Sequence, residues 1–189
     1  MKVLLDTCVM YPTVMREVLL AVARQGLFTP LWSQRILDEW SRAAAKLGPA
    51  GQVQADAEIA MVTAQWPKAR VPVPPAGLQD RLWLPDANDV HVLAAAISGN
   101  ADLILTENAK DFPRNILAEE GLSRSDPDAF LIGLAASAPE AVHHAVTQVH
   151  DEANRLSDRP WNLRQLLKKA RLPRLGKALT APGRDHSSE

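Results

Sequence analysis

Residues 84–113 read LPDANDVHVLAAAISGNADLILTENAKDFP, a stretch in which polar groups stand at the ends of an apolar helix and a short apolar strand. Either Asp86 or Asn88 can cap a helix that runs to about Ser98, where Gly99 and an asparagine supply the stop. The run 102–106 then has the length and composition of a buried strand. A helix followed by a buried strand indicates a unit of an α/β fold.

Two aspartates in this stretch allow two interpretations. At about 100° per residue, Asp89 lies on the same helix face as Leu93 and Ala96, while His91 points to the opposite, exposed face. A buried carboxylate is costly unless a cation or several donors satisfy it. In the structural alternative, Asp86 is the N-cap and Asp89 is an acid favoured by the helix dipole. The helix alone leaves both interpretations open.

The loop after the predicted strand carries Thr106, Asn108 and Asp111. In open parallel sheets, ligand sites lie at the carboxyl ends of the strands. The polar side chains of this loop are therefore candidates for a ligand site at the carboxyl end of the predicted strand.

Two further acids come from the first 40 residues. The apolar run 2–5 lacks polar alternation and predicts a central strand, which Asp6 follows directly. Ser33 is a good N-cap for a helix over 34–47, and Glu39 lies at the edge of its apolar face. A glutamate at the edge of an apolar face commonly reaches solvent. Glu39 therefore indicates a functional site only in combination with the other acids.

The remaining segments continue the alternation of strands and helices. The sequence predicts further strands over 27–32 and 121–124 and further helices over 13–26, 53–66, 126–137, 139–156 and 161–171. Pro30 either argues against a strand over 27–32 or places that strand near an edge of the sheet, and the run 71–77 predicts a rigid extended connection or an edge strand. We expect an α/β domain over 1–137 with a small parallel sheet of four or five strands, a helical extension over 138–178 and a disordered tail over 179–189.

Composition narrows the class of protein. With 189 residues, 47% of them hydrophobic and 23% charged, the chain can bury one good core. The single cysteine, Cys8, excludes an internal disulfide framework and a cysteine-rich zinc site. The N-terminal apolar run is too short for a signal peptide, and no segment reaches the ~18 apolar residues of a membrane span. We expect a cytoplasmic protein that does not associate with membranes.

Charge is distributed unevenly along the chain. Residues 155–189 hold nine Lys/Arg against three Asp/Glu, whereas residues 1–154 hold twelve against nineteen. An acidic body suits a cation and a basic extension suits a polyanion. The alternative for the extension is a solvated helix face followed by a disordered end.

The polar positions predict one site. Asp6, Glu39, Asp89, Asn108 and Asp111 should converge on the carboxyl edge of the sheet. Their hard oxygen ligands select Mg²⁺ or Mn²⁺ rather than zinc. Carboxylates that meet in space repel one another without a cation, and a divalent metal ion resolves that repulsion.

Four pieces of the sequence together resemble a known family, the PIN domain. They are LLDT over 4–7, QRILDE over 34–39, NDVHVLAAA over 88–96 and LTENAKDF over 105–112. The resemblance covers about residues 1–130 and rests on the order and spacing of these pieces. It implies a three-layer sandwich and the activity of the metal-dependent ribonucleases found in VapC-like bacterial toxins and RNA-processing enzymes.

The resemblance also implies roles for individual residues. Asp6, Glu39 and Asp89 become metal-binding acids, with Asn108 and Asp111 completing the site. Asp86 matches a frequently acidic neighbouring position, and Thr106, in the loop after the predicted strand, is a second subsidiary candidate. Cys8 departs from the asparagine that the family often has there, which affects a hydrogen bond to the site rather than a metal ligand.

Partners follow from the same resemblance. RNA is the implied substrate, and basic side chains would have to offset the repulsion between its backbone and the acids; we expect these from Arg164, Lys168, Lys169 and Arg171. A toxin would have a small antitoxin that caps the cleft, and PIN-like proteins often form homodimers. Neither the RNA target nor the number of metal ions follows from the sequence.

Three other classes of protein compete with this interpretation. A hydrolase of the haloacid dehalogenase type needs a second acid two residues after Asp6, where this chain has Cys8. A receiver-like signalling domain has no use for Glu39 or for the loop over 106–111. A PIN-like module that binds RNA or a partner, with a weak or inactive site, is the serious alternative, although the presence of all the acids favours an enzyme.

Overall fold

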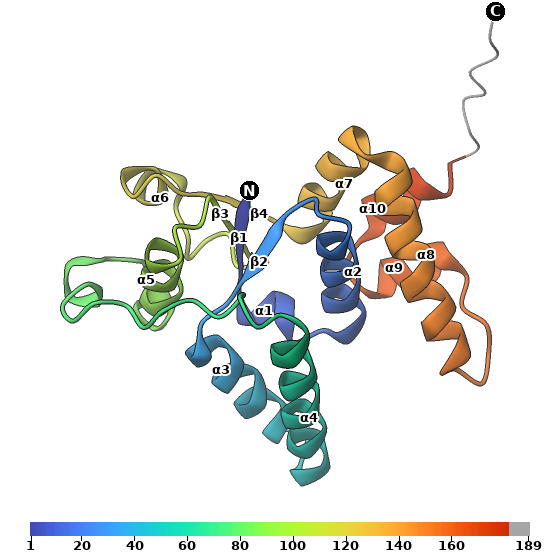
Figure 1. The fold of residues 1–189 in the computed structure, drawn as a ribbon, viewed down its shortest axis with the longest axis horizontal. Helices are drawn as coiled ribbons and strands as arrows, with labels where there is room; N and C mark the ends of the chain where they lie inside the picture. Colours follow the sequence, from blue (N-terminus) through green and yellow to red (C-terminus); the bar gives the residue numbers. More distant parts are fainter. Residues whose placement is uncertain (182–189) are drawn as a thin grey trace, which may run out of the picture.

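A computed structural model describes residues 1–181 as an α/β fold around a four-stranded parallel sheet (Figure 1). The strands are β1 (Lys2–Leu5), β2 (Thr29–Leu31), β3 (Leu103–Leu105) and β4 (Ser123–Ser125), in the spatial order β2-β1-β3-β4. All neighbouring strands are parallel, with Val3 opposite both Pro30 and Leu103. The predicted fold class is confirmed, with β1 in the interior and β2 on an edge.

The helical elements connect these strands and extend beyond them. In chain order they are α1 (Thr7–Met10), α2 (Thr13–Arg24), α3 (Gln34–Ala45), α4 (Pro49–Gln65), η1 (Gln79–Arg81), η2 (Ala87–Asp89), α5 (Val90–Ser98), α6 (Arg114–Glu119), α7 (Pro127–Ser137), α8 (Pro139–Arg155), α9 (Leu163–Lys169) and α10 (Pro173–Leu179). Short elements α1, α6 and α10 were not predicted, because a single turn or two carries no clear helical period.

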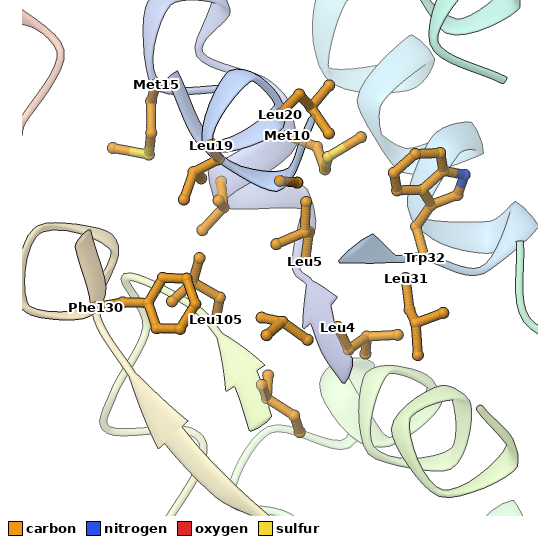
Figure 2. Close-up of a cluster of buried hydrophobic side chains, with 14 of the residues drawn as sticks. Leu4, Leu5, Met10, Met15, Leu19, Leu20, Leu31, Trp32, Leu105 and Phe130 are labelled. Atoms are coloured by element: carbon orange, nitrogen blue, oxygen red, sulfur yellow. The ribbon is translucent and has the colours of Figure 1, made fainter. Parts of the chain in front are cut away.

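Helices cover both faces of the sheet. In Figure 1, α5 lies on one side of the strands, and α2 with α7 lies on the other. Successive side chains of a strand point to opposite faces. Figure 2 accordingly shows Leu5 on the side of the sheet where α2 carries Leu19 and Leu20, while Leu4 lies near Leu31, and all of these except Leu31 are fully buried. This double coverage explains why the strands lack polar alternation.

The end of α5 packs very closely against the β2 side of the sheet. A Cβ atom at Gly99 would lie 2.6 Å from Cγ1 of Val71, so a larger residue would force the Val71 side chain to shift. Asn100, with φ of 49°, is the residue that adopts the left-handed conformation. The helix therefore ends where the sequence predicted. Gly99 allows the close packing, and Asn100 supplies the left-handed turn.

The C-terminal helices pack onto the same core. α8 lies along α2, and α10 contacts α7. The buried Asp128 of α7 accepts hydrogen bonds from the backbone N–H groups of Arg174 and Leu175, both at 2.9 Å. Leu179, predicted to begin a disordered tail, instead ends α10 and packs partly buried against the core, while 182–189 of that predicted tail lie outside the described residues.

Within residues 1–181, every helix is too short or too polar to cross a bilayer.

Candidate metal centre

Asp6 lies at the carboxyl end of β1, where the strand gives way to α1. Its side chain is buried, with 7% of the residue exposed. Oδ1 accepts a hydrogen bond of 2.6 Å from the backbone N–H of Thr7, and Oδ2 accepts one of 2.7 Å from the hydroxyl of Thr106. Asp6 is therefore the N-cap of α1 and is held both by the start of α1 and by the residue that follows β3.

Cys8 supports the same carboxylate. Its Sγ lies 3.1 Å from Oδ2 of Asp6 and accepts a hydrogen bond of 3.3 Å from the backbone N–H of Glu107. Burial, followed by the charge of Asp6, raises the pKa of the Cys8 thiol to about 12. The thiol stays protonated at neutral pH and donates to Asp6. Cys8 therefore supplies a hydrogen bond to the site at the position where the family often has an asparagine.

Three aspartates meet beside Asp6. Asp86, Asp89 and Asp111 each place a carboxylate oxygen within 4.8 Å of the other two. Burial, followed by the negative charges of Asp6, Asp86 and Asp111, raises the pKa of Asp89 to about 6. The amide of Asn108 lies 3.3 Å from Oδ2 of Asp89. Negative charge is concentrated here with little compensation, so the cluster favours a proton or a cation.

The capping question has a different answer for each aspartate. Asp86 accepts a hydrogen bond of 2.9 Å from the backbone N–H of Asn88 and is the N-cap of η2. Asp89 stands at the start of α5 but makes no side-chain capping bond. Asp86 is therefore the predicted N-cap and also belongs to the acidic cluster, while Asp89 is an acid of the first turn without a capping bond.

Glu39 lies on the α3 side of the same edge in a different environment. One carboxylate oxygen accepts from the Thr7 hydroxyl at 2.9 Å, and the other lies 2.9 Å from Nε2 of His91. Arg35 approaches this second oxygen to 3.4 Å. Partial burial opposes ionisation, but the hydrogen bond and charge of His91, together with Thr7 and Arg35, outweigh it and lower the pKa of Glu39.

His91 was predicted to be exposed, and that prediction is wrong. Only 4% of the residue is exposed, because His91 contacts Glu39 of α3 and Val71 of the extended segment 70–74 packs against the end of α5. Its Nε2 faces Glu39, and its Nδ1 has no hydrogen-bond partner within residues 1–181. The available signal was a histidine in a helix that is apolar on nearly every side; periodicity alone could not show that both sides were covered.

The loop over 107–113 is held in place at several points. Phe112 is fully buried, and its carbonyl accepts a hydrogen bond of 2.6 Å from Nε of Arg124 on β4. The backbone N–H of Asp111 donates to the carbonyl of Asn108 at 3.2 Å, which closes the turn. Asp111 therefore joins the cluster from a loop with a fixed conformation.

The four basic residues predicted to bind RNA divide into two groups. Arg164, Lys168 and Lys169 are exposed on α9, where Nζ of Lys169 lies 4.7 Å from the ring centroid of Trp161. Arg171 instead forms an ion pair with Glu107, in the loop that follows β3. Only Arg171 reaches the rim of the acidic site.

The predicted site thus has two connected halves. Asp6, Asn108, Asp111 and the two aspartates of the helix start form one half, and Glu39 lies in the other. Thr7 joins them, since its N–H donates to Asp6 and its hydroxyl to Glu39. The donors are carboxylate and amide oxygens, which fit Mg²⁺ or Mn²⁺.

Comparison with known families agrees with this geometry. A sequence model described as a PIN domain matches residues 2–110, more than half of the chain. The match contains every acid of the site except Asp111, which follows it directly. No curated protein and no solved structure matches the chain.

Proposed function

This chain belongs to the PIN domain family, whose fold is of the nuclease type, and from that premise we propose that it is a metal-dependent endoribonuclease that hydrolyses RNA phosphodiester bonds. One observation carries the proposal: three aspartate side chains lie within 4.8 Å of one another beside Asp6. Such a cluster is unfavourable without a cation. RNA phosphodiester cleavage is a reaction that bound divalent cations accelerate.

We propose that Asp6, Asp89, Asn108 and Asp111 hold Mg²⁺ or Mn²⁺, with Asp86 at the margin and Glu39 joining from α3. When bound, the metal would lower the pKa of a water molecule and neutralise charge on the leaving oxygen. The chain itself then has to orient these donors and needs no nucleophilic side chain.

Orientation comes from the contacts around each acid. Thr7 and Thr106 hold the two oxygens of Asp6, which limits rotation of its carboxylate. The lowered pKa of Glu39 keeps its carboxylate ionised at neutral pH, so it remains a hydrogen-bond acceptor. The contacts of Asp6 and of Glu39 are present without substrate, so these two acids are preorganised.

The biological setting is a further part of the proposal. By its resemblance to VapC-like toxins, the chain would be the toxin of a toxin-antitoxin pair, with a small antitoxin as partner and a homodimer as its assembly. The alternative is a catalytically weak PIN-like module that binds RNA or another protein.

A paired nuclease assay tests the activity. The purified full chain should cut RNA with Mn²⁺ or Mg²⁺, and Asp6→Asn or Asp89→Asn should reduce the rate by about 100-fold or more, because each removes a charged oxygen ligand. Asp151→Asn, which changes an exposed aspartate on α8, is the matched control and should cut like the unmodified chain.

Two outcomes would contradict the proposal. Equal cleavage by Asp6→Asn and the unmodified chain would identify a contaminating nuclease. Metal-independent RNA binding without cleavage, across RNA classes and both metals, would favour the binding module.

A further inference from the structure

A groove lies beside the Glu39 half of the site, and none of the acids of the aspartate cluster lines it. It has a volume of about 730 Å³ and runs between the start of α3, the extended segment 70–74 and α5. Segment 70–74 is fixed at its beginning, where the backbone N–H of Val71 donates to the carbonyl of Trp32 at 2.9 Å. The groove therefore extends the carboxyl edge of the sheet beyond β2. We call it the Arg70 groove.

Its walls differ in chemistry. Arg35 and Arg70 supply two guanidinium groups, and Nη1 of Arg70 donates to the side chain of Gln34 at 3.2 Å. Asp38 also lines the groove, but the Gln34 amide already donates to its carboxylate at 2.9 Å. The rest of segment 70–74 adds two prolines and Val73, which is 89% exposed. The lining therefore offers guanidinium groups to an anion and an apolar surface close to them.

The groove meets the site through shared residues. His91 and Arg35 both line it, and both contact the same carboxylate oxygen of Glu39, at 2.9 Å and 3.4 Å. His91 is 4% exposed, and its Nδ1 has no partner among the described residues. A ligand in the groove would therefore lie one side chain away from Glu39.

We infer that the Arg70 groove binds an unpaired nucleotide of single-stranded RNA next to the scissile phosphate. Arg70 would contact a backbone phosphate, since its guanidinium presents two parallel donors. The ribose or base would lie on Val73 and its neighbouring prolines, a contact that a base stacked inside a duplex could not make. The inference rests on the proposed ribonuclease function and adds where the substrate lies.

The Arg70 groove is not the RNA-binding surface that the distribution of charge along the sequence predicts, which is the basic C-terminal extension. The basic side chains of α9 are exposed, but Arg171, at the rim of the site, is already paired with Glu107. Among residues 1–181, the side-chain partner of Arg70 is the neutral Gln34, so more of its charge is available to a phosphate. We therefore place the main phosphate contact on the β2 side.

Binding of RNA by Arg70 variants tests the inference. Affinity of the full chain for a fluorescent, unstructured 12-nucleotide RNA would be measured by anisotropy with Ca²⁺ in place of Mg²⁺. Arg70→Ala should weaken binding about tenfold, the loss expected for one charge-assisted hydrogen bond, and should lower the slope of log affinity against log salt by about 0.7. Arg70→Lys should recover part of the affinity, since it keeps the charge without the fork.

Arg159→Ala, which changes an exposed arginine between α8 and α9, is the matched control and should bind like the unmodified chain. Melting temperatures of all variants would establish that they are folded. RNA carrying 4-thiouridine should form crosslinks within 71–81, a single tryptic peptide.

Unchanged affinity in folded Arg70→Ala, or crosslinks confined to 161–171, would overturn the groove assignment while leaving ribonuclease activity intact. If the unmodified chain neither binds nor cuts RNA, the proposed function and this inference both fail.

Discussion

Asp89 and Glu39 lie at the same edge of the sheet, yet their surroundings act on them in opposite directions. Asp89 is surrounded by other carboxylates, and burial together with those charges raises its pKa to about 6. Glu39 is surrounded by donors, and contacts with His91, Thr7 and Arg35 lower its pKa. One half of the site is therefore uncompensated, and the other is compensated by the protein itself.

This difference assigns separate tasks to the two halves. A cation gains most where negative charges already repel one another, so the aspartate half should bind metal first. Glu39 is already satisfied, and a metal ion would have to compete with His91 for it. The α3 half is better suited to orient groups and, through the Arg70 groove, to receive substrate.

Metal-dependent stabilisation gives the largest expected contrast between the halves. At one hundred times its dissociation constant, Mn²⁺ should stabilise the unmodified chain by about 2.7 kcal/mol, or about 5–10 °C in melting temperature. Asp89→Asn should lose most of this shift, whereas Glu39→Gln should keep at least half. Differential scanning fluorimetry with a Mn²⁺ titration measures both.

The reverse ranking, with the shift lost in Glu39→Gln and kept in Asp89→Asn, would show that the compensated half binds the metal. No shift in the unmodified chain at millimolar Mn²⁺ would count against the metal site as a whole.

The pH dependence of stability gives a smaller contrast. A carboxyl whose pKa rises from 3.8 to about 6 on folding binds more protons in the folded state, so its contribution to stability is present below pH 3.8 and is lost as pH rises through about 6. Because Asp89 is partly exposed, we discount the effect to about 1 kcal/mol, or about 2–4 °C.

Melting temperatures in EDTA between pH 4 and pH 7.5 measure this effect. The curve for Asp89→Asn should fall less over that range than the curve for the unmodified chain, because asparagine does not titrate. Parallel curves would mean that the carboxylates around Asp89 do not repel one another appreciably.

The basic residues of the C-terminal extension should have the smallest effect. Replacing Lys168, Lys169 and Arg171 with alanine removes three charges, but one of them is paired with Glu107. The slope of log RNA affinity against log salt should fall by less than the roughly 2 that three full phosphate contacts would give. A drop in affinity larger than that of Arg70→Ala would move the main RNA contact from the α3 half to α9.

Much of the fold could be read from local patterns. The uninterrupted apolar runs at 2–5 and 102–106 indicated strands covered on both faces, and Pro30 indicated an edge. Asp6 could be assigned to a strand end because the apolar run stops there. These features depend on neighbouring residues only, which is why sequence periodicity is sufficient.

His91 shows where such reasoning fails. A helical period states which residues share a face, but it does not state how many faces are covered. The chain covers the second face of α5 with α3 and segment 70–74, which are distant from it in sequence. The contact between His91 and Glu39 therefore could not be predicted from helical periodicity.

Local sequence patterns specify the α/β class, the acids and their positions at strand and helix ends, because hydrophobic periodicity and turn chemistry are local properties. Tertiary contacts establish that Asp86, Asp89 and Asp111 form an uncompensated cluster while Glu39 has partners in His91 and Arg35. The reason is physical: the pKa of a carboxyl depends on burial and on charges within a few ångströms, and those neighbours come from segments up to about a hundred residues apart.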